Sequence, residues 1–100
     1  MIKLSVMYPK AESLQFDMDY YRGSHIPMML RLIGESLKGF SIDRAATGSD
    51  LPAPYAEIAN LLFEPVETMQ AALAEHGPTL TADIPKYTNV QPVIQVSETS

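Results

Sequence analysis

The stretch FDMDYYRGSHIP, residues 16–27, gathers more groups able to bind a ligand or donate a proton than any other part of this chain. It contains Tyr21 and His25 and ends on Pro27, where a helix should continue. Asp17 is placed to cap a helix that begins here, because its carboxylate can accept a backbone amide of the first turn. Asp17, Tyr21 and His25 recur every four residues, so a continuous helix would carry them as one stripe.

Pro27 is expected to interrupt that helix. It has no N–H to donate, and it restricts the preceding Ile26 away from the helical region of backbone space. We therefore expect a kink or a fresh start near Gly23 and Ser24, with Ser24 as the new cap and Pro27 in the first turn. The second segment is expected to continue through MMLRLIGESL to about Lys38.

Strand patterns lie on both sides of this stretch. Apolar residues alternate with others from Ile2 to Tyr8, which predicts a strand with one strongly apolar face. Further along, the pattern predicts a second strand at residues 40–47, a loop at 48–54 and a long apolar strand at 55–63.

The remainder of the chain predicts one more helix and one more strand. Pro65 suits the first position of a helix, and Gly77-Pro78 predicts that this helix stops there. Residues 79–88 are expected to be irregular or briefly helical. A last strand is predicted at 90–96, and Pro92 favours an edge position for it in the sheet.

The resulting order β-α-β-β-α-β predicts an α+β fold in a single domain over residues 1–100. Right-handed crossovers convert this order into a ferredoxin-like split βαβ sheet, with both helices on one face and the first and third strands at the centre. The other face would combine apolar Met7 and Val93 with polar Lys3, Ser5 and Gln95. Pairing with a second copy of the chain would cover that face, so we expect a homodimer.

Composition excludes several classes of partner. The formal net charge is −5 without a run of Lys or Arg, which argues against nucleic acid and against an anionic membrane surface. No apolar run approaches the roughly 20 residues that span a bilayer. The chain has no cysteine and only two histidines, so we expect neither disulfides nor a metal site. A cytoplasmic location is the default expectation.

Three segments resemble the EthD family of dimeric α/β-barrel proteins. They are the opening strand IKLSVMYP, the stretch FDMDYYRGSHIP and the C-terminal segment DIPKYTNVQPVIQVSE. The resemblance implies two subunits with their sheets face to face, and a small-molecule pocket between each sheet and its helices. It also implies that Tyr21, His25, Asp83 and Tyr87 occupy the family's motif positions, without assigning their roles.

The resemblance also bears on activity. The family is named for a protein of an ether-degradation pathway, and related families include cofactor-free monooxygenases, lactone isomerases and polyketide cyclases. It therefore implies an oxygenase, isomerase or cyclase type of enzyme that uses no cofactor. A carrier or auxiliary protein that binds a hydrophobic pathway intermediate is the alternative. Haem handling with His25 as the axial ligand is a less favoured third hypothesis.

The residues themselves support a candidate site. His25 is the best candidate for a general acid or base, because an ordinary histidine titrates near neutral pH. We expect Tyr21 and Asp83 to share the catalytic site with it, with Asp83 orienting the ring. Tyr87 is expected to bind the substrate.

Each of these candidates also has a structural explanation. His25 could bond a backbone carbonyl, and Asp83 could shape the turn into the last strand. Tyr20 points about 100° away from Tyr21 on a helix and is expected to pack against the sheet. Met28 and Met29 could be core filler or the soft wall of a substrate pocket.

Overall fold

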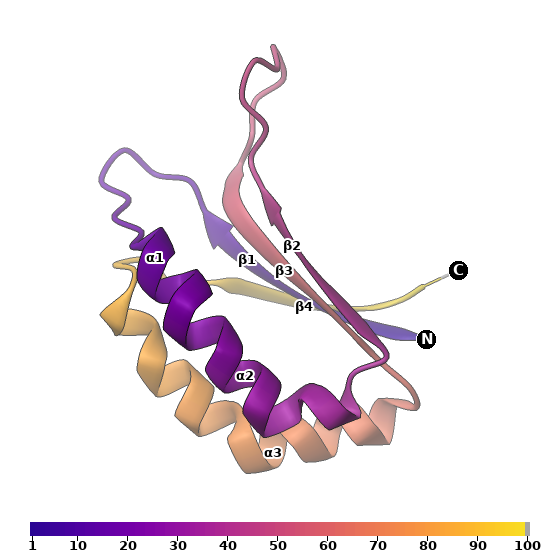
Figure 1. Cartoon of the computed structure of the whole chain (residues 1–100). Coiled ribbons are helices and arrows are strands. Elements are labelled where there is room, and N and C mark those ends of the chain that lie inside the picture. The colour runs from indigo at the N-terminus through magenta and orange to yellow at the C-terminus, as the bar shows by residue number, and fades with distance from the viewer. Residues whose placement is uncertain (100) are drawn as a thin grey trace.

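The computed structural model describes residues 1–99, in which a four-stranded sheet carries its helices on one face (Figure 1). The elements are β1 (Ile2–Pro9), α1 (Met18–Tyr20), a π-helical turn (Tyr21–His25), α2 (Ile26–Ile33), β2 (Gly39–Arg44), β3 (Tyr55–Phe63), α3 (Val66–Asp83) and β4 (Val93–Glu98). Short 3₁₀ turns follow α2 at Gly34–Ser36 and α3 at Ile84–Lys86. The predicted element order is confirmed.

The strands lie in the order β2-β3-β1-β4, and every neighbouring pair is antiparallel. The predicted ferredoxin-like split βαβ sheet is therefore confirmed, with β1 and β3 at the centre. The β2–β3 connection projects beyond the sheet, and the start of β1 and the end of β4 lie near the opposite end of the strands (Figure 1). The last strand begins three residues later than predicted, after Pro92 rather than around it.

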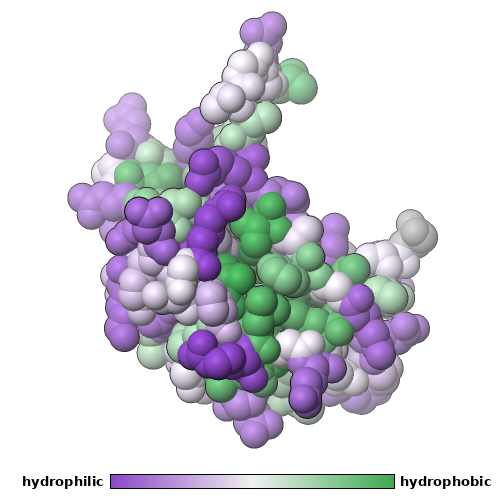
Figure 2. Space-filling view, in the orientation of Figure 1, coloured by the Kyte–Doolittle hydropathy of each residue, from purple (hydrophilic) through white to green (hydrophobic). Residues whose placement is uncertain are grey.

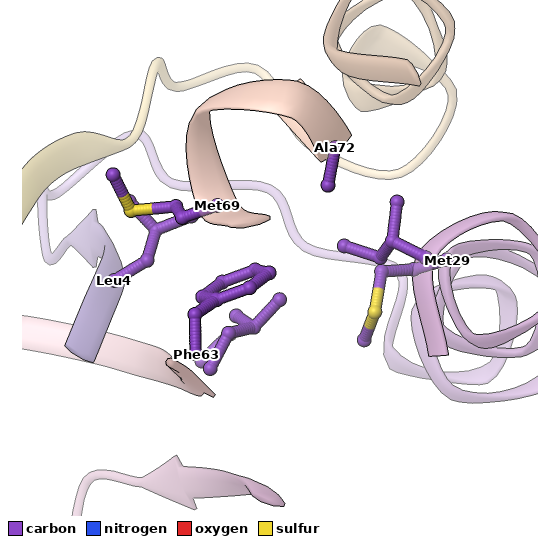
Figure 3. Packing of buried hydrophobic residues seen from close by; sticks show 8 residues of the cluster. Leu4, Met29, Phe63, Met69 and Ala72 are labelled. Atoms are coloured by element: carbon purple, nitrogen blue, oxygen red, sulfur yellow. The ribbon is translucent and has the colours of Figure 1, made fainter. Parts of the chain in front are cut away.

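Every second residue of the central strands β1 and β3 faces the helices, and the apolar ones among these residues form the core. Leu4 lies opposite Leu61 across β1 and β3, and both side chains face the helices. Phe63 is fully buried beneath Met69 of α3. Figure 3 shows Leu4, Phe63 and Met69 gathered between the sheet and the helices, with Met29 of α2 on the other side of the cluster. Burial of this apolar layer holds both helices against the sheet.

The first helix begins as predicted, but it does not restart at Ser24. The Asp17 carboxylate accepts the Tyr20 amide at 3.0 Å, which confirms the predicted N-cap. The helix then continues through the π-helical turn, in which the Ile26 amide donates to the Tyr21 carbonyl. This wider turn accommodates the donor missing at Pro27, so the chain needs no new cap.

The predicted stop at Gly77-Pro78 is wrong. Helix α3 runs through both residues to Asp83. Leu73 and Leu80, two turns apart on this helix, both pack against the core cluster. Their burial outweighs the helix-breaking tendency of Pro78, since helices in proteins are stabilised mostly by tertiary packing.

The helices do not cover the whole inner face of the sheet. Figure 2 shows apolar residues gathered between α2 and the strands, with hydrophilic residues around them. Phe40 of β2 faces the helix side of the sheet and is still 40% exposed. No helix within residues 1–99 combines the length and apolarity needed to cross a bilayer.

Candidate functional site

A cavity of about 660 Å³ lies between the sheet and the helices. Its walls come from β1, β3, α2, α3 and the segment that leads from α3 into β4. Most of the lining side chains are apolar, and Tyr8, Tyr21 and His25 add polar groups to the wall. This volume and this mixture are typical of sites that bind small organic molecules.

His25 is the last residue of the π-helical turn and is only 7% exposed. Its Nδ1 lies 3.0 Å from the Asp83 Oδ2, and its Nε2 lies 3.4 Å from the Tyr87 hydroxyl. The ring stacks on Tyr21, with centroids 5.8 Å apart and planes 14° apart. The sequence-predicted residues Tyr21, His25, Asp83 and Tyr87 therefore lie together in the structure. Their catalytic roles remain predictions.

Asp83 reaches His25 because α3 continues past Pro78 to place it there. Its other oxygen accepts the Tyr20 hydroxyl at 2.9 Å, and the Lys86 ammonium lies 3.5 Å away. Burial alone would raise the pKa of this carboxyl. The hydrogen bonds from His25 and Tyr20, together with the charges of His25 and Lys86, outweigh burial and lower the pKa. Asp83 is thus held as a carboxylate that accepts hydrogen bonds.

Two phenols extend this network towards the sheet. The hydroxyls of Tyr8 in β1 and Tyr87 lie 2.6 Å apart, and both side chains are buried. Burial raises the pKa of each phenol, so both remain protonated at neutral pH. A chain of contacts therefore runs from Tyr8 through Tyr87 and His25 to Asp83.

Tyr21 and Glu57 bury oxygens for which the described residues provide no hydrogen-bond partner. The ring of Tyr21 lines the cavity, but its hydroxyl is enclosed. Burial, with the charges of Tyr8 and Glu57, raises the pKa of this phenol. Glu57 lies opposite Tyr8 in the sheet, 1% exposed, with the Arg44 Nε 4.0 Å away. Burial raises the pKa of its carboxyl.

Some predicted ligand contacts lie on the cavity wall and others do not. Met29 lines the cavity, whereas Met28 and Tyr87 are not among its lining residues. Tyr20, expected to pack against the sheet, instead bonds Asp83 and stacks on Tyr87. These differences follow from the lengths and orientations of side chains, which an i, i+4 pattern does not specify.

Sequence reasoning missed Tyr8, Tyr20 and Glu57. A signal for Tyr8 was present, because it belongs to the apolar face of its strand and a buried tyrosine usually finds a partner for its hydroxyl. Glu57 lies on the same face of β3 as the buried Ala59, Leu61 and Phe63, because every second residue of a strand points to the same side. Its place on that face of the strand already indicated an ionisable group turned inward.

No three His, Asp or Glu side chains within the described part of the chain gather closely enough to hold a metal ion. Among the described residues that line the cavity, His25 is the one histidine that could bind a metal. Asp83 and Tyr87 already contact its two ring nitrogens. An axial bond from His25 to haem would displace one of these contacts.

Solved structures with the same architecture define the class of this protein. An EthD-like protein from Ralstonia eutropha JMP134 superposes with a TM-score of 0.85 and 32% sequence identity, over 97% of this chain and 89% of that one. An ethyl tert-butyl ether degradation (EthD) family protein from Bacillus halodurans C-125 gives a TM-score of 0.77 at 19% identity, over 100% and 99% of the two chains. The fold is thus shared along the whole length.

A protein from Arabidopsis thaliana has the same fold at 13% identity, with a TM-score of 0.69 over 99% of this chain and 94% of that one. No family model and no curated protein matches the sequence. The identity to the Ralstonia protein over nearly the full chain is high enough to show the family. The chain belongs to the EthD family.

Proposed function

We propose that the cavity binds a small, mostly apolar organic molecule and that His25 exchanges a proton with it, without a cofactor. The buried His25–Asp83 pair beside an apolar cavity is the observation that carries this proposal. A histidine whose other nitrogen is held by a carboxylate is a common arrangement for a general base, because the carboxylate stabilises the imidazolium that forms.

The neighbouring residues support this role. Asp83 orients the ring through Nδ1 and is itself fixed by Tyr20. Tyr21 stacks on the ring and forms part of the wall, and Met29 adds a deformable apolar surface. Tyr87 contacts the second ring nitrogen, through which the proton would pass. Proton removal is a first step shared by oxygenase, isomerase and cyclase reactions, so we propose that the protein serves such a step in the metabolism of small organic compounds.

A small aromatic alcohol tests the proposal. 2-Naphthol suits an apolar cavity of this size, and its neutral and ionised forms absorb light differently. We expect the wild-type protein to bind it and to carry roughly tenfold more ionised naphthol near pH 8 than the His25→Gln variant. The glutamine amide can still donate to Asp83, so binding should persist and the melting temperature should change little.

His76→Gln is the matched control, because His76 lies on α3 and is absent from the cavity wall. It should behave as the wild type does. Equal ionisation in the wild type and His25→Gln, with binding intact, would support the carrier function and reject the base. A protein that binds no naphthol would reject both. A large loss of stability in His25→Gln alone would indicate a structural histidine.

A further inference from the structure

Both ring nitrogens of His25 contact protein groups, and one of these contacts connects the ring to a second residue on the cavity wall. Nδ1 faces Asp83 at 3.0 Å, and Asp83 does not line the cavity. Nε2 faces Tyr87 at 3.4 Å, and Tyr87 does not line the cavity either. The Tyr87 hydroxyl lies 2.6 Å from that of Tyr8, and Tyr8 does line the cavity.

All hydrogen bonds along this chain of contacts can be donated in the same direction, from Tyr8 towards Asp83. Asp83 is held as a carboxylate and can only accept, so Nδ1 of His25 carries the proton between them. In a neutral ring Nε2 is then an acceptor, and the Tyr87 hydroxyl donates to it. The Tyr87 oxygen in turn accepts from Tyr8. The Tyr8 hydroxyl has therefore used its proton, and its oxygen can only accept a further hydrogen bond.

We infer that Tyr8 is the residue that contacts the reacting group, and that this group is an O–H of the ligand, such as an enol or a phenol. The inference rests on the proposed function and specifies its ligand class. A lone pair at Tyr8 suits a donor and disfavours a carbonyl or an ether oxygen, which has no proton to give.

The proton transfer along this path is balanced. The ligand O–H proton moves to the Tyr8 oxygen, the proton of Tyr8 moves to Tyr87, and the proton of Tyr87 moves to Nε2 of His25. The ligand becomes an oxyanion and His25 becomes an imidazolium beside the Asp83 carboxylate. The hydrogen bonds between the ligand, Tyr8, Tyr87 and Nε2 have then reversed, so Tyr8 donates a hydrogen bond to the oxyanion that it helped to create. The reverse sequence returns the proton, and no other reactant is needed.

Whether Tyr8 donates or accepts a hydrogen bond at the ligand thus depends on the protonation of His25. With the neutral ring, Tyr8 accepts a hydrogen bond from the ligand. With the charged ring, Tyr8 donates one. The groups around His25 that set this balance are Asp83 at the end of α3, Lys86 in the 3₁₀ turn that follows, Tyr20 and Tyr21 from the first helical segment, and Tyr87.

A matched pair of ligands tests the inference. 2-Naphthol and 2-methoxynaphthalene differ only in whether the oxygen carries a hydrogen or a methyl group. We expect the wild type to bind the alcohol roughly tenfold more tightly than the ether, since one hydrogen bond distinguishes them. Tyr8→Phe should abolish that preference while still binding the ether. Tyr55→Phe, a tyrosine absent from the cavity wall, should keep it.

An equal preference in Tyr8→Phe and in the wild type would overturn the inference and leave the proposed function intact. So would the absence of any preference in the wild type. Failure of both compounds to bind the wild type would instead reject the proposed function, and the inference with it.

Tyr87→Phe gives an independent test if Tyr8→Phe does not fold. This change breaks the path between Tyr8 and His25 and leaves the Tyr8 hydroxyl in place. The ionised fraction of bound naphthol should then fall to that of His25→Gln, and the preference for the alcohol over the ether should shrink, because the freed Tyr8 proton can bond the ether oxygen. An ionised fraction equal to that of the wild type would show that the proton does not pass through Tyr87.

Discussion

Glu57 places an ionisable group inside the layer between sheet and helices. Its side chain is buried next to Tyr8, and neither carboxyl oxygen has a hydrogen-bond partner among the described residues. The Arg44 Nε at 4.0 Å is too distant for a hydrogen bond. Burial raises the pKa of the carboxyl, opposed by the charges of Arg44 and Arg22, and the Asp43 charge adds to the rise. Ionised Glu57 therefore costs stability.

Because only the ionised carboxyl is unfavourable in this position, the stability of the protein should depend on pH. A carboxyl whose pKa is raised on folding contributes stability below its unfolded pKa of about 4.3, and that contribution is lost as pH rises through the folded pKa. Glu57→Gln keeps the shape and removes the charge. At pH 7 we expect the free energy of unfolding of the variant to exceed that of the wild type by about 1 kcal/mol. The variant should therefore melt at a higher temperature.

The advantage of Glu57→Gln should vanish near pH 4, where the wild-type carboxyl is also neutral. Calorimetric or circular dichroism melts across pH 4–8 measure it. Glu12→Gln removes the same charge from an exposed loop and serves as the control. A variant less stable than the wild type at pH 7 would mean that the Arg44 contact is worth more than burial costs.

Two irregular features of the helices bring the residues of the site together. The π-helical turn carries Tyr21 and His25 at its two ends and stacks their rings. The continuation of α3 through Gly77 and Pro78 carries Asp83 to the same place. Extra-wide turns of this kind occur often at functional sites, because they change the direction in which side chains project.

A pair of glycine substitutions tests the continuation of α3. A methyl group added at Gly77 would meet only the Leu73 Cβ, at 4.0 Å, which is ordinary contact. We expect Gly77→Ala to raise the stability by about 0.5–1 kcal/mol, because alanine loses less conformational freedom in a helix. Thermal or urea unfolding measures the change.

Gly48 is the contrasting position, because its φ of 79° lies in the left-handed region. Gly48→Ala should lower the stability by about 1 kcal/mol, since a side chain there adds strain. If Gly77→Ala were the more damaging of the two, the helix would not continue through position 77 as described.

The whole molecule has helices on one face of its sheet, whereas the other face carries no helix (Figure 1). By the strand register, Ile58, Met7 and Val93 form an apolar row across β3, β1 and β4 on the open face. Val93 is 45% exposed. An apolar row on a face that also carries polar side chains is suited to burial against a second copy. We therefore propose that the chain forms a homodimer through this face.

A single charge tests the homodimer. Light scattering of the wild type at micromolar concentration should give twice the 11.0 kDa mass of the chain. Val93→Asp should give the single mass, because a buried unpaired carboxylate opposes association. Leu30→Asp places the same charge on an exposed apolar residue of α2 and should leave the dimer intact. A wild type with the single mass would contradict the proposal.

The sequence by itself determined the order of elements and the sheet. Alternation along Ile2–Tyr8 and 55–63 specifies which side chains face inward, because a strand turns successive residues to opposite faces. The cap at Asp17 and the edge position of β4 also followed from local chemistry. The grouping of Tyr21, His25, Asp83 and Tyr87 came from the family resemblance rather than from any of these patterns.

Tertiary structure decided the features that local patterns contradict. Packing of Leu73 and Leu80 against the core carries α3 through Pro78, although the local signal there favours a stop. The distance from His25 to Asp83 depends on that packing, since the two residues are 58 positions apart. The partners of Tyr8 and the burial of Glu57 were likewise set by which strands and helices meet. Such contacts depend on the free energy of the whole core, which no short stretch of sequence contains.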